Sequence, residues 1–542
     1  MIRTFQQISS SDLSVVGGKG TNLGVLLRAG FPVPPGFCVT TLAFSAFVAG
    51  CTQLDLLYDE LDALAADDVK AASVVGAKVR SALLSVPLPE QVATACVAAW
   101  HEIGSDFAYA VRSSATAEDL PGASFAGQQD TFLNIRGEAA LLDAVRRCFV
   151  SLFTDRAILY RQKNHFGHRD VRLSVVVQRM VFPDAAGILF TADPLTGHRG
   201  TMTIDAGFGL GEALVSGLIT ADLYRIDKKT GSLKELRIGD KMLAVRALRG
   251  GGTATERLSD SLRSMRVLDG KDLRELCALG RRVEAFYGGV PQDIEWCKEG
   301  RELFLVQARP VTSLYPLPEP LPSGDAVHVY FGFSHAQNMT APISPLGRDL
   351  WQVMFPVGKR HLSDIPESPT VMVSAGGRLY IDVTSVLKVP ALRRIVIGAL
   401  SAVYPDLATL IEQLADRPEV QAVSPPSMAS LRSLISLLGP VPPRLLRELL
   451  IGHPEKLRSS LEELIEEKLE TFSRELAALP FGLPRLQKLL PLLSEMFEVL
   501  PNFIPRFGVG MLSLRLLRQR FAGTPHAPDV EALQRGLFGN IT

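Results

Sequence analysis

Hydrophobic residues follow one pattern in the first half of the chain and a different one in the second. Up to about residue 313, short apolar runs of strand length alternate with stretches in which apolar residues recur every three or four positions. The first pattern is typical of strands and the second of helices, so we expect a mixed region of the α+β class. The clearest strand-like runs are VRLSVVVQRMVF, AGILFTA, GTMTIDA and RELFLVQAR.

The second half is rich in leucine at helical spacing from about residue 390 onward, for example in SSLEELIEEKLETFSRELAAL at 459–479. Prolines interrupt this pattern, which predicts a series of short helices. Between the two halves, RPVTSLYPLPEPLPSGD at 309–325 holds five prolines. Proline excludes regular helix and central strand, so this segment is interpreted as a stiff linker.

The patterns divide the chain into three parts. We expect a first domain over 1–313, a proline-rich linker over 314–325 and a mostly helical domain over 326–542. The last residues, LQRGLFGNIT, form no polar tail. We therefore expect the sequence to end inside a domain, which leaves the helical domain incomplete.

Charge and cysteine usage argue against several classes of function. Lys+Arg and Asp+Glu both number 57, so the chain lacks the net charge that would favour binding to nucleic acid or to a membrane surface. The six cysteines lie far apart without a CxxC pair, which favours small core residues over a zinc or redox site. The N-terminus lacks a signal-peptide core, and the most apolar run, at 37–51, is shorter than the ~18–20 residues of a membrane span. We expect a cytoplasmic protein with no membrane or nucleic-acid partner.

The stretch VRSSATAEDLPGASFAGQQDTFLNI at 111–135 offers little to bury. Arg112 is predicted to end a strand, FAYAVRS, and a guanidinium can bind phosphate oxygens through its planar fork of donors. The long polar loop that follows is unusual inside a compact domain unless it has a function. We interpret it as a mobile lid over phosphate, with a disordered surface loop as the alternative.

Glycines flank Lys19 in VVGGKGTNLG, and a helix is predicted to begin near Thr21–Asn22 and end at Gly30. Free N–H groups at a helix start, together with a lysine, suit an anion. The segment is no Walker A loop, because Gly20 follows Lys19 where that motif has Ser or Thr. A glycine turn with a solvated lysine is the competing interpretation.

A second glycine-rich segment, IDAGFGLGEALVSG, lacks the GxGxxG spacing of dinucleotide-binding turns. A phosphate site and a close-packed turn between strand and helix are equally open here.

The segment PQDIEWCKEGRELFLVQARPVT at 291–312 predicts a β-hairpin with a three-residue turn, Glu299–Gly300–Arg301. That turn pairs residue 298 with 302 and residue 295 with 305. Because strand side chains alternate, Gln307 and Arg309 then share a face with Glu295, which lies diagonal to Gln307. A carboxylate, an amide and an arginine suit a hard metal beside polyphosphate, although a solvated outer face has the same composition.

Taken in order, these motifs resemble the ATP-grasp domain of the phosphoenolpyruvate synthase and pyruvate phosphate dikinase superfamily. The matching segments are GGKGTNLG, GFPVPPGF, VRSSATAEDLPGASFAGQQDTFLN, TADPLTG, GLGEALVSG and QDIEWC…LFLVQARPVT. The resemblance covers the chain to about residue 313 and implies an ATP-grasp fold there. Beyond it, FGFSHAQNMTAPISPLG at 331–347 resembles the start of the helical substrate domain of rifamycin phosphotransferases.

The resemblance implies a role for individual residues. Lys19 and Arg112 match the catalytic cations that hold the ATP phosphates, and Arg309 lies with them. Glu295 and Gln307 match Mg²⁺ ligands, and the run 178–181 matches the segment whose backbone reads adenine. The full set of expected ATP-binding positions is Lys19, Arg112, Gly122, Ser124, Gly127, Gln128, Thr131, Gln178, Met180, Val181, Glu212, Gln307 and Arg309.

The family chemistry implied is a dikinase reaction with ATP and Mg²⁺, in which ATP is cleaved to AMP and one phosphate passes through a phosphohistidine. The carrier pattern GGxxSHAAxxAR does not occur in this sequence, and His335, in Ser-His-Ala, lacks the downstream residues of that pattern. We therefore expect a separate phosphohistidine-domain protein and a small hydroxylated acceptor such as a rifamycin. Phosphoenolpyruvate synthesis from pyruvate, and a subunit or remnant inactive alone, are the alternatives.

Overall fold

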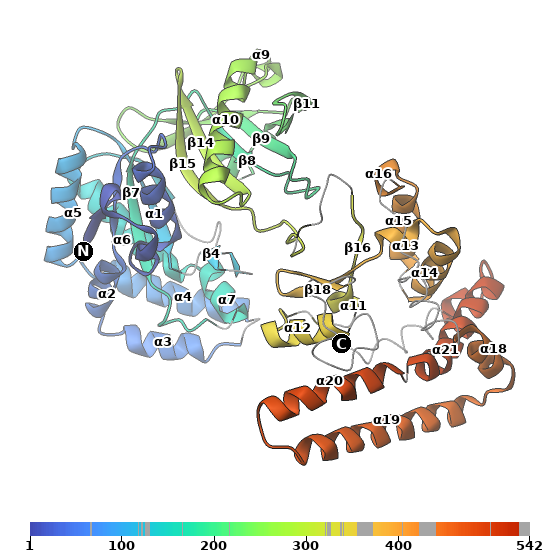
Figure 1. The fold of residues 1–542 in the computed structure, drawn as a ribbon. Coiled ribbons are helices and arrows are strands. Elements are labelled where there is room, and N and C mark those ends of the chain that lie inside the picture. The colour runs from blue at the N-terminus through green and yellow to red at the C-terminus, as the bar shows by residue number, and fades with distance from the viewer. Residues whose placement is uncertain are drawn as a thin grey trace. The chain divides into compact units, whose positions relative to one another are not determined.

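The computed structural model of the chain describes most residues of two compact units, Met1–Tyr315 and Pro316–Thr542. The described residues are 1–65, 68–116, 119–120, 123–124, 131–164, 166–215, 217–319, 321, 327–336, 339, 341–354, 372–403, 405–421, 441–498 and 500–530. Helices and strands both occur in each unit (Figure 1).

The first unit is built on two antiparallel sheets. One has five strands, and their order across the sheet is β1 (Ile2–Thr4), β2 (Gly36–Val39), β7 (Leu173–Arg179), β3 (Tyr109–Ala115) and β6 (Thr131–Ile135). The central strand β7 therefore joins two strand pairs that come from distant parts of the chain. Short 3-10 turns lie at Phe5–Gln7, Ser10–Asp12 and Ser151–Phe153.

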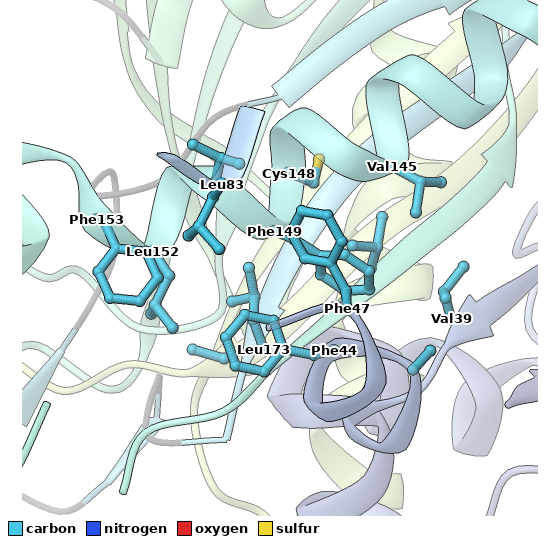
Figure 2. Close-up of a cluster of buried hydrophobic side chains, with 14 of the residues drawn as sticks. Val39, Phe44, Phe47, Leu83, Val145, Cys148, Phe149, Leu152, Phe153 and Leu173 are labelled. Carbon is cyan, nitrogen blue, oxygen red and sulfur yellow. The ribbon is translucent and has the colours of Figure 1, made fainter. Parts of the chain in front are cut away.

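A layer of helices covers one face of the five-stranded sheet. These are α2 (Thr41–Ala49), α3 (Leu54–Asp62), α4 (Val69–Leu84), α5 (Glu90–Ile103), α6 (Glu138–Val150) and α7 (Asp155–Lys163). Their apolar faces and the strands share one core, where Phe44, Phe47 and Phe149 meet ring to ring (Figure 2). Cys148 lies in the same core, and all six cysteines are free thiols, five of them buried. They are thus small core residues, as the sequence predicted.

The second sheet has six strands. Their order is β11 (Leu233–Arg237), β10 (Asp222–Asp227), β9 (Thr201–Phe208), β8 (Ala185–Phe190), β14 (Gln292–Glu299) and β15 (Glu302–Pro310). One face packs against α10 (Gly270–Phe286), through Leu189, Ile294 and Trp296 among others. A capping box starts α10, because the Asp269 carboxylate accepts from the N–H of Asp272 and the Asp272 carboxylate accepts from the N–H of Asp269. The opposite face carries Asp205, Glu295 and Gln307 in one row across the strands.

Smaller elements complete the first unit. Helix α1 (Leu13–Arg28) packs on both β7 and β15 and so touches both sheets. A hairpin of β12 (Leu243–Ala247) and β13 (Thr253–Arg257) lies in the chain between β11 and β14. The short helix α8 (Glu212–Val215) lies between β9 and β10, and α9 (Asp260–Ser264) follows the hairpin. The two-residue strands β4 (Asp119–Leu120) and β5 (Ala123–Ser124) pair with each other.

The second unit combines a small sheet with helices. Its sheet has the order β16 (Tyr330–Gly332), β18 (Arg378–Asp382), β17 (Met372–Ala375). The described helices are α11 (Phe333–Ala336), α12 (Pro345–Met354), α13 (Thr384–Leu387), α14 (Pro390–Val403), α15 (Pro405–Ala415), α16 (Pro418–Gln421), α18 (Val441–Ile451), α19 (Pro454–Ala477), α20 (Leu483–Glu498) and α21 (Leu500–Phe521).

The expectation of short helices punctuated by proline is wrong for the last three. Helix α19 has 24 residues, and α20 and α21 each contain a proline in the helix interior, Pro491 and Pro505. In α19 the proline stands at the helix start, where a missing N–H costs nothing. The prolines inside α20 and α21 are accommodated within single helices, so proline alone did not mark a boundary there.

Within the described residues, a single helix that could cross a membrane by length and composition is not found; only α2 and α3 taken together pass such a test, across a bend of 105°.

Candidate active site

The guanidinium of Arg112 brings the two sheets of the first unit together. Its Nη2 donates to Gln307 Oε1 at 2.8 Å, and Nη1 and Nη2 both reach Val306 O at 3.3 Å. Glu295 Oε2 lies 3.8 Å from Nη2. Arg112 is only 8% exposed, so these oxygens, and not bulk water, stabilise its positive charge.

Arg112 was predicted at the end of a strand, and that is wrong. Strand β3 continues to Ala115, and its polar residue Ser114 is buried and hydrogen-bonded. Ser114 Oγ donates to Val16 O at 2.9 Å, and every residue of β3 is buried. A buried strand of this kind carries serine only where the hydroxyl has a backbone partner, which the apolar pattern does not reveal.

The predicted pairing of the hairpin β14–β15 is also wrong. Glu299 pairs with Glu302 and Lys298 with Leu303, which leaves a two-residue turn in place of three. A bulge between Glu295 and Trp296 then shifts the register, so Glu295 pairs with Gln307 directly. A bulge adds one unpaired residue to one strand and re-aims its neighbours. The result places Glu295 opposite Gln307, closer than the diagonal position expected.

The residues on the face of the six-stranded sheet away from α10 lie in rows. One row across the strands is Leu223, Asp205, Ile188, Glu295 and Gln307. The next row contains Asp293 opposite Arg309, and Arg309 Nε donates to Asp293 Oδ2 at 2.9 Å. Asp293 was missed from the sequence. It stands two residues before Glu295 on the same strand, and strand alternation was the signal that could have found it.

Lys19 lies on α1, just after a break in the helix. Gly17 has φ 69°, and a β-carbon there would lie 2.3 Å from Ser114 Oγ. The helix therefore begins at Leu13 and resumes after Gly17, earlier than the predicted start near Thr21–Asn22. Thr21 is buried inside the helix, where its Oγ1 donates to Gly17 O at 2.8 Å. Lys19 itself is half-buried one residue beyond the start of the resumed helix.

The expected adenine segment runs off the end of β7. Gln178 is buried and its Nε2 donates to Pro34 O at 3.3 Å. Met180 is buried in an apolar cluster with Ala108, Leu210 and Val245. Val181 follows Met180 and is half-buried. The glycine-rich motif reaches the same cluster through Leu210, and Glu212, two residues later, is the first residue of α8.

Three expected positions of the phosphate lid, Gly122, Gly127 and Gln128, lie outside the described residues. Ser124 belongs to β5, of which only the backbone is described. Thr131, the first residue of β6, pairs with Arg112 across the sheet. Of the expected residues, the structure thus brings Arg112, Glu295 and Gln307 into contact, with Thr131 as a strand neighbour.

The donor set around Arg112 fits a magnesium ion that also binds phosphate. In the part of the chain that the structure describes, no group of three or more His, Cys, Asp or Glu side chains could hold a metal alone. Mg²⁺ commonly takes one or two carboxylates and completes its shell with water and phosphate oxygens. Glu295 and Gln307, directly paired on one sheet face, offer a carboxylate and an amide oxygen of this kind.

Cys297 and Asp205 are two of the titratable groups on the six-stranded sheet whose pKa values depart from their ordinary range. Burial raises the pKa of the Cys297 thiol to about 12, and the Glu295 carboxylate adds to the increase. Burial also raises the pKa of the Asp205 carboxyl. The thiol therefore stays protonated and is a poor nucleophile in this site.

The family described as pyruvate phosphate dikinase, AMP/ATP-binding domain, matches residues 13–317, more than half of the chain. The chain belongs to this family. The match includes every residue that the geometry brings together around Arg112.

The similar proteins fall into two groups by name. Rifampicin phosphotransferase of Bacillus subtilis is 43% identical over 73% of this chain and 44% of its own length. The protein of that name from Streptomyces sviceus is 44% identical over 76% of this chain and 46% of its own. A probable phosphoenolpyruvate synthase of Methanothermobacter thermautotrophicus is 43% identical over 57% of this chain and 46% of its own. The chain spans less than half the length of each of these relatives.

Proposed function

We propose that this chain is the ATP-binding part of a dikinase-type phosphotransferase whose final acceptor is a small hydroxylated molecule of the rifamycin class. The observation that carries the proposal is the convergence of Arg112, Gln307 and Glu295 in a member of this nucleotide-binding family. A guanidinium suits phosphate oxygens, and the neighbouring carboxylate and amide oxygens suit Mg²⁺. Together they describe a site for a metal-bound triphosphate.

In this proposal each residue has a separate task. Arg112, Lys19 and Arg309 neutralise the phosphate oxygens, and Glu295 and Gln307 hold Mg²⁺ against them. A bound Mg²⁺ would supply positive charge beside the phosphate oxygens and so stabilise the negative charge that develops during transfer. Electrostatic stabilisation of this kind is the main task of a protein in phosphoryl transfer. The segment Gln178–Val181 takes the base.

The extent of similarity favours a rifamycin-type acceptor over pyruvate. The matches to the two rifampicin phosphotransferases span 396 and 415 residues, whereas the match to the probable phosphoenolpyruvate synthase spans 315. The first two therefore extend into the second unit, which we propose to be the substrate domain, joined by the linker at 314–325. The carrier histidine is proposed to come from a separate domain or protein.

Binding of Mg-ATP by the full chain tests the nucleotide site. Arg112→Ala should raise the dissociation constant at least about tenfold in calorimetry, because a charge-assisted contact to phosphate is lost. Arg169→Ala is the matched control, since Arg169 pairs with Asp59 and Asp62 on the surface of the first unit. Equal affinity of wild type and Arg112→Ala would contradict the assignment.

Supplying the missing carrier tests the acceptor. The chain, ATP and a family phosphohistidine domain should release AMP in a reaction that depends on a rifamycin and not on pyruvate. Dependence on pyruvate would favour the phosphoenolpyruvate synthase alternative. AMP release with a rifamycin from the chain alone would contradict the need for a separate carrier.

A further inference from the structure

We propose that Asn134 is a positioning residue that holds the β12–β13 hairpin in place as the wall of the nucleobase end of this site. The inference rests on the proposed function, because it takes ATP as the ligand. Asn134 is fully buried in β6. Among the described residues it is the one non-glycine residue with a positive φ, 55°. Side chains with a β-carbon disfavour this conformation, although asparagine tolerates it better than most.

The side-chain amide of Asn134 forms hydrogen bonds to the backbone at the tip of the hairpin. Its Nδ2 donates to Leu248 O and to Gly252 O, both at 2.7 Å. Its Oδ1 accepts from Arg136 Nε at 3.2 Å. Two carbonyl oxygens require a donor and the guanidinium requires an acceptor, so the three contacts fix which atom of the amide faces which partner.

The backbone of Asn134 reaches the expected base segment as well as the hairpin. Its N–H points at Met180 Sδ, 2.9 Å away, and its carbonyl accepts from Gly252 N at 3.0 Å. The left-handed backbone conformation lets one residue present both backbone groups and its side chain to different partners. Asn134 thus joins β6, Met180 and the hairpin tip.

The hairpin packs on apolar residues just past the end of β7, where Met180 lies four residues beyond Val176, the strand partner of Arg112. Val245 on β12 is buried with Ala108, Met180 and Leu210. Leu210 N also donates to Val245 O at 2.9 Å, which ties the hairpin to the glycine-rich motif. An apolar surface with few polar groups suits a base, whereas the rows around Glu295 suit phosphate. The hairpin therefore touches both segments, 178–181 and 209–212, that flank the base end.

The division of the site into two ends gives a selective test. Asn134→Asp keeps the shape but replaces both donors with a charged oxygen that faces two carbonyls. The dissociation constant of Mg-ATP should rise about tenfold or more, while that of magnesium tripolyphosphate, which has no base, should stay within about twofold. Asn134→Gly, which keeps the positive φ without strain, should shift the two constants in the same pattern. Asn164→Asp is the matched control: Asn164 donates to Tyr160 O at the end of α7, so both constants should be unchanged.

Equal weakening of ATP and tripolyphosphate, or of neither, would overturn the role of Asn134. If wild-type protein binds tripolyphosphate but not ATP, or neither ligand, the proposed function fails instead. Amide hydrogen exchange of the wild-type protein tests the same role of the hairpin even if the variants do not fold. ATP should slow amide hydrogen exchange at Gly252 and along 243–257, and tripolyphosphate should not. Equal protection by both ligands, or none by ATP, would contradict the hairpin as a wall of the base end.

Discussion

At the scale of single residues, Arg161 and His168 form a buried, hydrogen-bonded pair. Arg161 Nε donates to His168 Nδ1 at 3.0 Å and Nη1 to Leu152 O at 2.7 Å. His168 must then be neutral, with its proton on Nε2. Burial lowers the pKa of His168 to about 4, and the positive charge of Arg161 contributes to the decrease. The pair is therefore a source of acid sensitivity in the helical layer of the first unit.

The folded and the unfolded protein protonate His168 at different pH values, and this difference makes the free energy of unfolding depend on pH. In the unfolded chain His168 takes up a proton below about pH 6.5, but in the folded protein its imidazole stays neutral until about pH 4. The contribution of neutral His168 to the free energy of unfolding is thus fully present above pH 6.5 and is lost as the pH falls toward 4. Relative to His168→Gln, whose side chain does not titrate, the wild type should lose about 2 kcal/mol between pH 7.5 and pH 5. Urea unfolding followed by tryptophan fluorescence checks this, and parallel pH dependence of the two proteins would contradict it.

At the scale of elements, the break in α1 explains how a helix passes so close to β3. Gly17 takes a positive φ and lies where a β-carbon would overlap Ser114 Oγ and Ser114 O. The helix can therefore pack directly on β3, the strand that carries Arg112. Lys19 follows the break at Gly17 by two residues. Ser114 Oγ also accepts from Gly20 N at 3.3 Å.

Gly17→Ala should destabilise the first unit by about 2–5 kcal/mol, because it adds overpacking to a strained backbone. Gly231→Ala separates the two contributions. Gly231 has φ 74°, and a β-carbon added there would meet no atom within 4 Å, so only about 1 kcal/mol of backbone strain is expected. Chemical unfolding compares the variants, and equal losses at the two positions would rule out close packing as the cause.

The sequence predicted the elements of the first unit better than their alignment. The runs around Val176, Ile188 and Ile204 are strands, as their apolar pattern indicated. The partner of Glu295 was predicted wrongly because a bulge has no signature in apolar spacing. Asn134 was missed for a related reason. Its importance comes from contacts to residues 46, 114 and 118 positions away, which no local pattern records.

At the scale of the whole molecule, the proposed nucleotide site lies within Met1–Tyr315, one of the two compact units. The fragment 1–315 should therefore fold and bind Mg-ATP within about twofold of the full chain's affinity. The fragment 316–542 should bind none. Calorimetry on the two fragments checks both statements. Weaker binding by 1–315, by about tenfold or more, would mean that the second unit contributes to the nucleotide site.

The contact between Arg112 and Gln307 also has a consequence for synthesis of the protein. The two residues are 195 positions apart in the chain, so at ~5–20 residues per second a ribosome needs about 10–40 s to pass from one to the other. Strand β7, which joins the halves of the five-stranded sheet, emerges within that interval. The nascent chain must therefore keep Arg112 hydrated after its own sheet is complete, until β15 arrives. A pause in translation between residues 180 and 300 would prolong the time during which this arginine lacks its partner.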